Sequence, residues 1–267
     1  MNKEDQVLVS IIMNCHNGEK YLKESIDSVI DQTYSNWELI FFNNLSDDSS
    51  LSILQLYNDK RIRIFNSKNF LNLYEARNEA IKKCSGKYIC FLDTDDLWLR
   101  DKLQKQVLFL ESKPIYSMVY SNYYNYFQEK KKTDIKYKNI LPEGKITDKL
   151  LKHYFIGILT IMIKRKIFET SFFDSKLNVI GDFEFFISLS LEKKIGCIQK
   201  PLAIYRIHKN NFSKKNYNIY IRELSNWIKV NNKFFKNKGI SLFYQKYFLF
   251  KLRIKNIIQK LFMIKNF

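Results

Sequence analysis

The sequence predicts an α/β fold in which a mostly parallel sheet carries helices on both faces. In the N-terminal part of the chain, short apolar runs recur, and each ends in a polar turn that leads into a helical pattern. Repeated units of strand, turn and helix fold into parallel sheets, because the helix returns the chain to the edge where the strand began. The apolar run at residues 88–92 also supports this fold, because it ends abruptly in carboxylates. In open α/β sheets, ligands bind just beyond the carboxyl ends of the strands.

The elements are expected to follow this unit in order. We expect strands over residues 9–13, 37–42 and 88–92, of which 9–13 and 88–92 are apolar enough to be buried, and a short strand over residues 63–65. Helical patterns occur at residues 22–30, 51–57 and about 74–83, and the polar turn at 43–49 supplies good helix N-caps. Since the carboxyl ends of parallel strands meet at one edge of a sheet, the turns at 14–18, 43–49 and 93–96 are predicted to open together.

Three carboxylates stand at this edge, on Asp93, Asp95 and Asp96. Carboxylates this close repel one another unless a cation shares them. Hard oxygen donors suit Mg²⁺ or Mn²⁺, and such sites leave positions open for phosphate oxygens. The alternative is an Asp-rich turn that caps a helix beginning near Leu99.

Two segments carry a family resemblance. They are VSIIMNCHNGEKYLKESIDSVIDQTYSNWELIFFNNLSDDSS at residues 9–50 and EARNEAIKKCSGKYICFLDTDD at residues 75–96. Both are similar to the family 2 inverting glycosyltransferases of the GT-A type, which bind a nucleoside-diphosphate sugar on a Rossmann-like sheet. The resemblance implies transfer of a sugar, from a UDP-sugar in the favoured case, to a hydroxyl of a glycan or lipid-linked glycan. It further implies a place in surface-polysaccharide or lipopolysaccharide synthesis.

The resemblance also implies roles for the acidic turn. Asp95 and Asp96 match residues that hold the donor ribose and a divalent metal, Mn²⁺ or Mg²⁺, which neutralises the departing diphosphate. Asp93 begins the motif and would orient the turn or bind the metal through water. Arg77 matches a position that faces the nucleotide, where a guanidinium can pair with phosphate oxygens or stack on the base.

The predicted nucleotide pocket departs from the family pattern. Asn43 and Asn44 stand where the family commonly has two aspartates, while Asn14 and His16 stand where it often has Pro and Tyr. Asn17 completes the predicted nucleotide-sugar contacts of the first turn. An asparagine can accept from a uracil or thymine imide and donate to a carbonyl. Uridine and thymidine diphosphates therefore fit, and guanosine and cytidine diphosphates stay open.

An inverting transfer needs a general base to take the proton of the attacking acceptor hydroxyl. Asp182 is the candidate, because GDFEFF at residues 181–186 opens an apolar helix and resembles the family's acidic pair, with Gly181 in place of Glu. Glu184 is the rival. Two residues turn about 200° around a helix, so the two carboxylates cannot face one pocket.

A later segment, PLAIYRIH at residues 201–208, resembles a family stretch that ends in Tyr-Arg-x-His and returns to the active site. The resemblance places Arg206 beside the leaving diphosphate and makes His208 a metal ligand with Asp95 and Asp96. A single histidine is equally compatible with a structural role.

The chain is expected to divide at residue 215. Residues 1–215 would form the catalytic domain, with a nucleotide-sugar half over 1–115 and an acceptor half over 116–215. Acceptor choice is expected to depend on residues 127–157, where the resemblance is sparse. Residues 216–267 would form a basic helical extension.

The extension is strongly basic, since no Asp or Glu follows Glu223 while ten Lys or Arg lie between Lys229 and Lys265. Its last helix is expected to carry an apolar stripe of Phe243, Tyr247, Phe250, Ile254, Ile257, Ile258 and Leu261 opposite Lys246, Arg253, Lys255 and Lys260. A basic amphipathic helix lies on anionic membranes. Residues 240–265 are therefore predicted to attach the protein to the inner face of the plasma membrane. Alternatively, the stripe packs on the catalytic domain.

Composition and cysteine spacing argue against several other classes of protein. The four cysteines lack CxxC spacing and residues 7–13 are too short for a signal peptide, so we expect a cytoplasmic protein without a zinc site or disulfide frame. The net charge of +18 would suit nucleic acid, but no DNA- or RNA-binding motif accompanies it, and no nucleic-acid partner is expected. A catalytically idle sugar-nucleotide-binding module and a nucleotidyltransferase stay open as alternatives.

Overall fold

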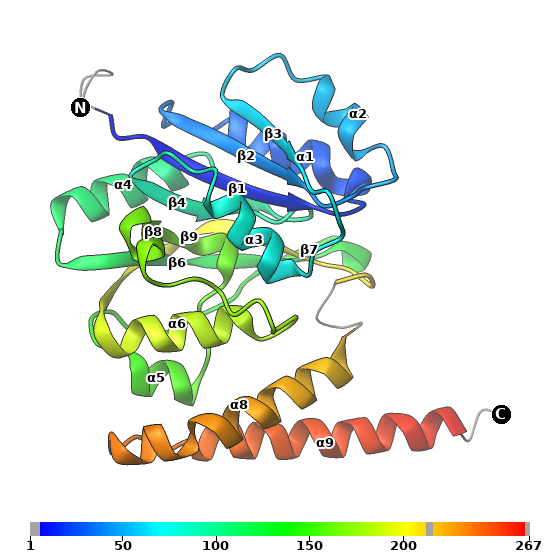
Figure 1. Ribbon diagram of the computed structural model, residues 1–267, viewed down its shortest axis with the longest axis vertical. Helices are drawn as coiled ribbons and strands as arrows, with labels where there is room; N and C mark the ends of the chain where they lie inside the picture. The colour runs from blue at the N-terminus through cyan, green and yellow to red at the C-terminus, as the bar shows by residue number, and fades with distance from the viewer. Residues whose placement is uncertain (1–5, 212–215, 265–267) are drawn as a thin grey trace.

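A nine-stranded sheet forms the centre of the described chain (Figure 1). The computed structural model describes residues 6–211 and 216–264, with side chains to residue 258. The strands are β1 (Val9–Cys15), β2 (Trp37–Asn43), β3 (Ile62–Asn66), β4 (Tyr88–Phe91), β5 (Leu97–Trp98), β6 (Tyr116–Phe127), β7 (Lys132–Ile135), β8 (Met162–Lys164) and β9 (Lys194–Ile207). They are ordered β3-β2-β1-β4-β8-β6-β9-β5, and β7 pairs with β6.

Helices connect the strands as the sequence predicts. They are α1 (Glu19–Ile30), α2 (Ser50–Gln55), α3 (Leu73–Ile81), α4 (Lys102–Ser112), α5 (Thr147–Lys152) and α6 (Gly181–Glu192), with short 3₁₀ turns η2 (Gln128–Lys130), η3 (Ile158–Thr160) and η4 (Arg165–Glu169). Asn72 and Glu75 form a capping box that fixes the start of α3. The acidic turn does not cap a helix at Leu99, because β5 intervenes and α4 begins at Lys102.

The sheet is parallel where the sequence pattern is most regular and mixed beyond it. β1 pairs in parallel with β2 and β4, and β2 pairs in parallel with β3. β8 then lies antiparallel to both β4 and β6, while β6 and β9 run parallel. The carboxyl ends of β1, β2 and β4 therefore meet at one edge, as predicted.

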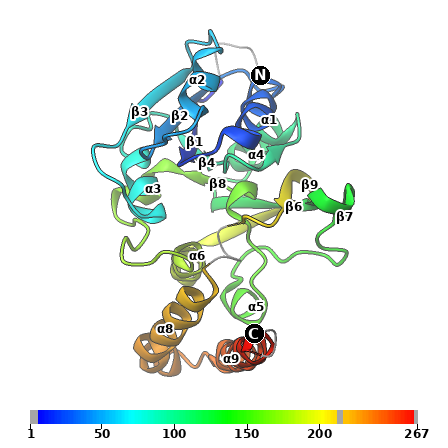
Figure 2. The same ribbon diagram turned by 90° about the vertical axis from the view of Figure 1, so that its right-hand side faces the viewer.

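Alternating side chains of β1 divide the core into two layers. Val9, Ile11 and Met13 pack with α1, α2 and α4 on one face of the sheet. Ile12 belongs to the other layer, which includes residues of α3, α5 and α6. Figure 2 shows helices on both sides of the strands. This arrangement confirms the α/β fold with helices on both faces, because successive strand residues point to opposite sides.

Two further helices, α8 (Tyr217–Asn237) and α9 (Phe243–Ile264), lie side by side at the end of the molecule away from α2 (Figures 1 and 2). Trp227 of α8 packs edge-on against Phe183 of α6 with ring centroids 4.9 Å apart, and Gln245 of α9 donates to the backbone carbonyl of Leu151. The helical C-terminal extension is confirmed. A domain boundary at residue 215 stays a prediction, and residues 212–215 lie outside the described residues.

One face of α9 is buried and the opposite face is exposed. Leu249 and Leu252 are 8% and 9% exposed, whereas Phe243, Phe250 and Ile257 are 62%, 59% and 58% exposed. Tyr247, Ile254 and Ile258 are exposed as well. The predicted stripe is thus turned away from the protein, within the described side chains. Those of Lys260 and Leu261 lie outside this range.

The predicted position of the cations on α9 was wrong. They do not lie opposite the stripe, because that side of the helix packs on the protein through Leu249 and Leu252. Instead they flank it: Arg253 donates to Ser225 of α8, and the ammonium of Lys251 lies 4.4 Å from the Tyr247 ring centroid. The helix therefore presents an apolar face with cations along its sides.

Candidate active site

A cavity of about 650 Å³ lies beyond the carboxyl ends of β1 and β4. It brings together eight of the predicted site residues, namely Asn14, His16, Asn44, Arg77, Asp93, Asp95, Asp96 and Asp182. Arg206 and His208 are not among its lining residues but bond to the carboxylate turn from behind. The cavity therefore joins the two halves of the predicted site, which lie about ninety residues apart in the sequence.

The carboxylates of the acidic turn are held by β9 and the loop that follows it. The backbone N–H of Arg206 donates to Asp96 Oδ1 over 2.9 Å, and His208 Nε2 lies 2.8 Å from Asp95 Oδ2. Burial raises the pKa of Asp96 well above its usual range, and the charges of Asp95 and Asp93 raise it further. Burial, together with the charge of Asp93, also raises the pKa of Asp95. A bound cation would stabilise the ionised form of both groups.

His208 and Arg206 brace this turn. The backbone N–H of Asn210 donates to His208 Nδ1, so Nε2 carries the proton that is shared with Asp95. A metal bound at Nε2 would displace this proton, so His208 would act as a ligand only in place of its bond to Asp95. Arg206 donates to the Asp95 carbonyl, to Gln128 and to Glu24, at 2.9, 2.8 and 2.7 Å. Its guanidinium is thus bonded within the protein. A role for Arg206 at the leaving group stays a prediction.

The donor set of the turn fits a hard divalent cation. Asp95, Asp96 and His208 would supply carboxylate oxygens and an imidazole nitrogen, which are ligands that Mn²⁺ and Mg²⁺ accept. Within the described residues, no three His, Cys, Asp or Glu side chains are already arranged as a ligand set. Metal binding by these residues stays a prediction.

The two asparagines of the second turn are engaged within the protein. Asn44 donates to the Leu71 carbonyl over 2.8 Å and accepts from its N–H over 2.9 Å. Asn43 donates to Asn66 and accepts from the Ser46 N–H, both over 3.0 Å, and it does not line the cavity. These amides brace the turn, and base reading by them stays a prediction.

The first turn places an aromatic pair at the rim of the cavity. His16 Nδ1 lies 2.9 Å from the Asn44 carbonyl oxygen, and its ring packs edge-on against Phe70 with centroids 4.9 Å apart. Asn14 lies deeper, and its Nδ2 is buried without a hydrogen-bond partner among the described residues. Asn17 has a left-handed backbone and accepts from the Asp47 N–H, outside the cavity.

Asp182 lies across the cavity from the acidic turn, linked to it by Arg77. The buried guanidinium donates from Nη1 to Asp182 Oδ1 over 2.6 Å and from Nη2 to Asp93 Oδ1 over 3.1 Å. The Asp182 N–H donates to Tyr74 Oη over 3.2 Å. Burial raises the pKa of Asp182 above its usual range, against the lowering effect of Arg77.

Glu184 faces a different groove. It lines a hollow with Ser188 and Glu192, and its carboxylate accepts from the Ser188 hydroxyl over 2.9 Å. Asp182 and Glu184, in the first turn of α6, therefore point to separate surfaces, as their helical spacing predicts. Of the two, Asp182 alone can reach a substrate in the cavity that contains Asp95 and Asp96.

Gly181, which departs from the family pattern, is explained by Tyr74. A Cβ at residue 181 would lie 2.5 Å from the Tyr74 ring, closer than van der Waals contact allows. The missing side chain lets the ring approach the start of α6, where its hydroxyl accepts from the Asp182 N–H.

The loop before Asp182 is fixed by the C-terminal extension. Glu223 of α8 is buried, and its carboxylate accepts from the backbone N–H groups of residues 178–180 at 2.7, 3.0 and 3.2 Å. The last acidic residue of the chain thus binds the segment that leads into the predicted base. Helix α8 belongs to the support of the site.

Several residues that line the cavity, or that hold its lining in place, were not predicted from the sequence. They include Phe70, Tyr74, Tyr154 and Asn211 in the lining and Glu223 behind it. The capping-box pattern of Asn72 and Glu75 could have indicated the start of the helix that contains Tyr74. For Glu223, no local pattern in the sequence indicated its role, because its partners lie more than forty residues away.

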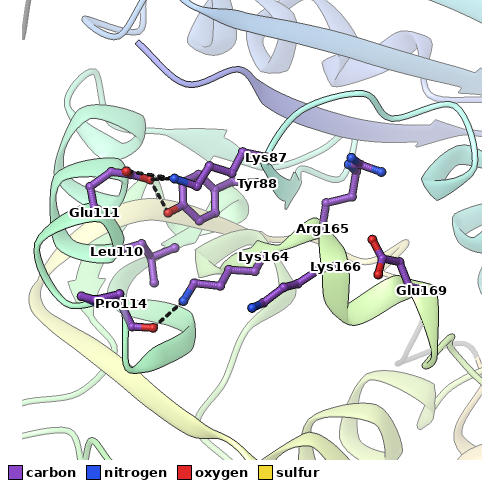
Figure 3. Close-up of a pocket in the computed structure, with 9 residues that line it drawn as sticks. All are labelled: Lys87, Tyr88, Leu110, Glu111, Pro114, Lys164, Arg165, Lys166 and Glu169. Carbon is purple, nitrogen blue, oxygen red and sulfur yellow. Dashed lines mark hydrogen bonds and ion pairs between the residues drawn. The ribbon is translucent and has the colours of Figure 1, made fainter. Parts of the chain in front are cut away.

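A second cavity, of about 320 Å³, lies at the amino end of β4 (Figure 3). Several cationic side chains line it. Two of them are bonded within the protein, since Lys87 pairs with Glu111 at 2.7 Å and Lys164 donates to the Pro114 carbonyl over 2.6 Å. Its described lining contains none of the predicted site residues. We therefore place the candidate active site in the larger cavity.

Comparison with known proteins decides the family. The profile described as "Glycosyl transferase family 2" matches residues 10–172, which include the acidic turn, Arg77 and both asparagine turns. The chain belongs to glycosyltransferase family 2. Its fold and the order of its motifs agree with the resemblance noted from the sequence.

Among curated relatives of this family 2 member is WfgD of Escherichia coli, a UDP-Glc:alpha-D-GlcNAc-diphosphoundecaprenol beta-1,3-glucosyltransferase. It is 30% identical over 242 residues, which cover 90% of this chain and 91% of WfgD. TuaG of Bacillus subtilis, a putative teichuronic acid biosynthesis glycosyltransferase, is 35% identical over 161 residues. These residues cover 60% of this chain and 63% of TuaG.

Solved structures share the fold. S. aureus TarS 1-349 in complex with UDP-GlcNAc aligns with a TM-score of 0.65 and 15% identity, over 82% of this chain and 66% of that one. The mannosyltransferase PcManGT from Pyrobaculum calidifontis, in complex with GDP-Man and Mn²⁺, aligns with a TM-score of 0.63 and 14% identity. That match covers 85% of this chain and 66% of PcManGT.

Proposed function

We propose that this family 2 glycosyltransferase moves a sugar from a UDP-sugar to a hydroxyl of a lipid-linked glycan, with inversion and with a divalent metal. The cavity that contains Asp182 opposite Asp95 and Asp96 is the observation that supports this most directly. WfgD uses UDP-glucose and an undecaprenyl diphosphate acceptor, and TarS binds UDP-GlcNAc. These relatives support the UDP-sugar donor and the lipid-linked acceptor.

The residues of the chain would share the reaction as follows. Asp182 would take the proton of the acceptor hydroxyl while its oxygen bonds to the anomeric carbon and the bond from that carbon to the diphosphate breaks. Asp95, Asp96 and His208 would hold Mn²⁺ or Mg²⁺. When bound, the metal would stabilise the negative charge of the departing nucleoside diphosphate. Arg77 would orient Asp182 through their ion pair.

We further propose that the protein works at the inner face of the plasma membrane, where a lipid-linked acceptor is present. The exposed apolar face of α9 and the cations beside it suit an anionic lipid surface. No helix in the described part of the chain is long and apolar enough to cross a membrane. We propose peripheral attachment through residues 240–265 because of this apolar face and its cations.

A donor panel tests the proposal. UDP-, GDP-, CDP- and dTDP-sugars would each be added with and without Mn²⁺, and the thermal midpoint and the release of nucleoside diphosphate measured. A ligand at 100 times its Kd adds about 2.7 kcal/mol to the free energy of unfolding. We expect stabilisation by a UDP-sugar that needs the metal, and turnover with a short-chain GlcNAc diphosphate lipid. Binding without turnover would favour an idle sugar-nucleotide-binding module.

A further inference from the structure

Tyr154 has a buried hydroxyl with no hydrogen-bond partner among the described residues. Its ring lines the large cavity and packs edge-on against Phe183 of α6, with centroids 5.5 Å apart. Buried hydroxyls are nearly always bonded in folded proteins, because an unpaired polar group loses its water without compensation. A ligand in the cavity would supply the partner that the protein lacks.

The position of Tyr154 is on the Asp182 side of the cavity. Burial raises the pKa of its hydroxyl, and the charge of Asp182 raises it further, followed by the influence of Tyr74. The hydroxyl therefore stays protonated and can both donate and accept. The chain on its C-terminal side adds Ile156 and Ile158 to the wall, which gives an apolar surface next to this polar group.

A second unpartnered atom lines the same cavity. Asn14 Nδ2 is also buried without a partner within the described residues, and it lies at the end of β1, beside the acidic turn on β4. The cavity thus has one unsatisfied group on the side of the predicted donor contacts and another beside the predicted base. This distribution matches a site that takes two substrates.

We propose that the Tyr154 hydroxyl binds a hydroxyl of the acceptor sugar, next to the hydroxyl that Asp182 deprotonates, and thereby selects the acceptor. The inference rests on the proposed function. The Tyr154 ring packs on Phe183, the residue after Asp182, so we assign its ligand to the nucleophilic substrate. It also lies within residues 127–157, outside the motifs that carry the family resemblance.

Tyr154→Phe tests this inference, because it removes one oxygen and keeps the ring against Phe183. The assay measures the KM of a short-chain GlcNAc diphosphate lipid, the KM of the UDP-sugar and the acceptor-independent hydrolysis of that donor. We expect the acceptor KM to rise about tenfold or more, because the variant loses the hydrogen bond to the acceptor hydroxyl and leaves that hydroxyl unpaired in the site. Donor KM and donor hydrolysis should change less than about twofold, and the thermal midpoint should not fall.

Tyr120→Phe is the matched control. The Tyr120 hydroxyl donates to the Pro142 carbonyl over 2.5 Å and lies outside the cavity lining. Its removal should lower the thermal midpoint and leave the acceptor KM unchanged.

Three results would overturn the inference. An unchanged acceptor KM in Tyr154→Phe, or an equal rise in donor and acceptor KM, would each refute acceptor selection while leaving the proposed function intact. A wild-type protein that neither hydrolyses nor transfers any donor sugar would refute the proposed function, and the role of Tyr154 with it.

Discussion

Arg77 holds Asp182 through a 2.6 Å ion pair inside the cavity, and the same guanidinium bonds Asp93 of the acidic turn. The arginine therefore ties the predicted base to the predicted donor turn. Because it is buried and bonded to both carboxylates, its effect on chemistry is electrostatic and positional.

Removing this charge should change the pH dependence of transfer. Burial raises the pKa of Asp182 and Arg77 lowers it, so Arg77→Gln should raise that pKa further. Since a general base must be ionised, activity is lost as pH falls through its pKa, and the acid limb of kcat/KM should move to higher pH. Arg77→Lys, which keeps the charge, is the control. An acid limb at the wild-type position in Arg77→Gln would refute the coupling.

Asp182→Asn should remove transfer and keep donor binding. Loss of a general base costs about 10²- to 10⁴-fold in rate, whereas the metal and donor contacts proposed here are made by Asp95 and Asp96 and do not use this carboxylate. Steady-state kinetics and a thermal-shift titration with the donor would separate the two effects. Glu184→Gln is the matched control, because it lies on the same helix and faces another groove. Normal transfer by Asp182→Asn would give the base role to another group.

Asp96→Asn should abolish metal-dependent turnover. The amide keeps an oxygen for the Arg206 N–H, so the fold should persist, but the charge that attracts the cation is lost. Titration of Mn²⁺ in the presence of UDP, followed by electron paramagnetic resonance, would report binding directly. Asp134→Asn, at an exposed ion pair on β7, controls for general loss of charge. Undiminished activity in Asp96→Asn would refute the metal assignment.

Glu223→Gln should destabilise the protein and disturb the Asp182 loop. The carboxylate accepts from three backbone N–H groups, and an amide offers one oxygen in place of two. Leaving a buried N–H unpaired costs about 1–3 kcal/mol, which denaturant unfolding would detect. Glu192→Gln, at an exposed carboxylate on α6, should change stability little. Equal midpoints for the two variants would contradict this support role.

Most of the fold could be predicted from local patterns in the sequence. β1 to β4 and their turns could be predicted, because apolar runs and polar turns are set by neighbours along the chain. The acidic turn follows from the same patterns, whereas the choice of Asp182 as the base depends on the family resemblance and stays a prediction. The spacing of Glu184 correctly predicted that it faces another groove.

Contacts between distant segments could not be predicted. The bond from Glu223 to the loop at residues 178–180 joins parts of the chain more than forty residues apart, and no short pattern encodes it. On α9, both the buried and the exposed faces are apolar, so periodicity alone could not place the cations. The partners of Arg77 depend likewise on the packing of α3 against α6.

The exposed face of α9 predicts binding to anionic membranes. Phe250→Glu with Ile257→Glu should reduce flotation with phosphatidylglycerol vesicles. Each inserted apolar side chain contributes about 1.5–3 kcal/mol, so the partition coefficient should fall well over tenfold. Because both side chains are more than half exposed, the thermal midpoint should not change. Wild-type binding should weaken with salt and on neutral phosphatidylcholine vesicles, since the flanking cations attract anionic headgroups.

Leu56→Glu is the matched control for this face. Leu56 is 79% exposed just after α2, at the end of the molecule away from α9 (Figure 1). It adds one negative charge at a comparable apolar position, the same charge as Phe250→Glu alone and half that of the double α9 variant, so flotation should stay close to wild type. Equal flotation by the wild type and the α9 variant would refute membrane binding by this face. Equal losses in Phe250→Glu and Leu56→Glu would contradict a specific role of the α9 face, because the two sites lie at opposite ends of the molecule (Figure 1).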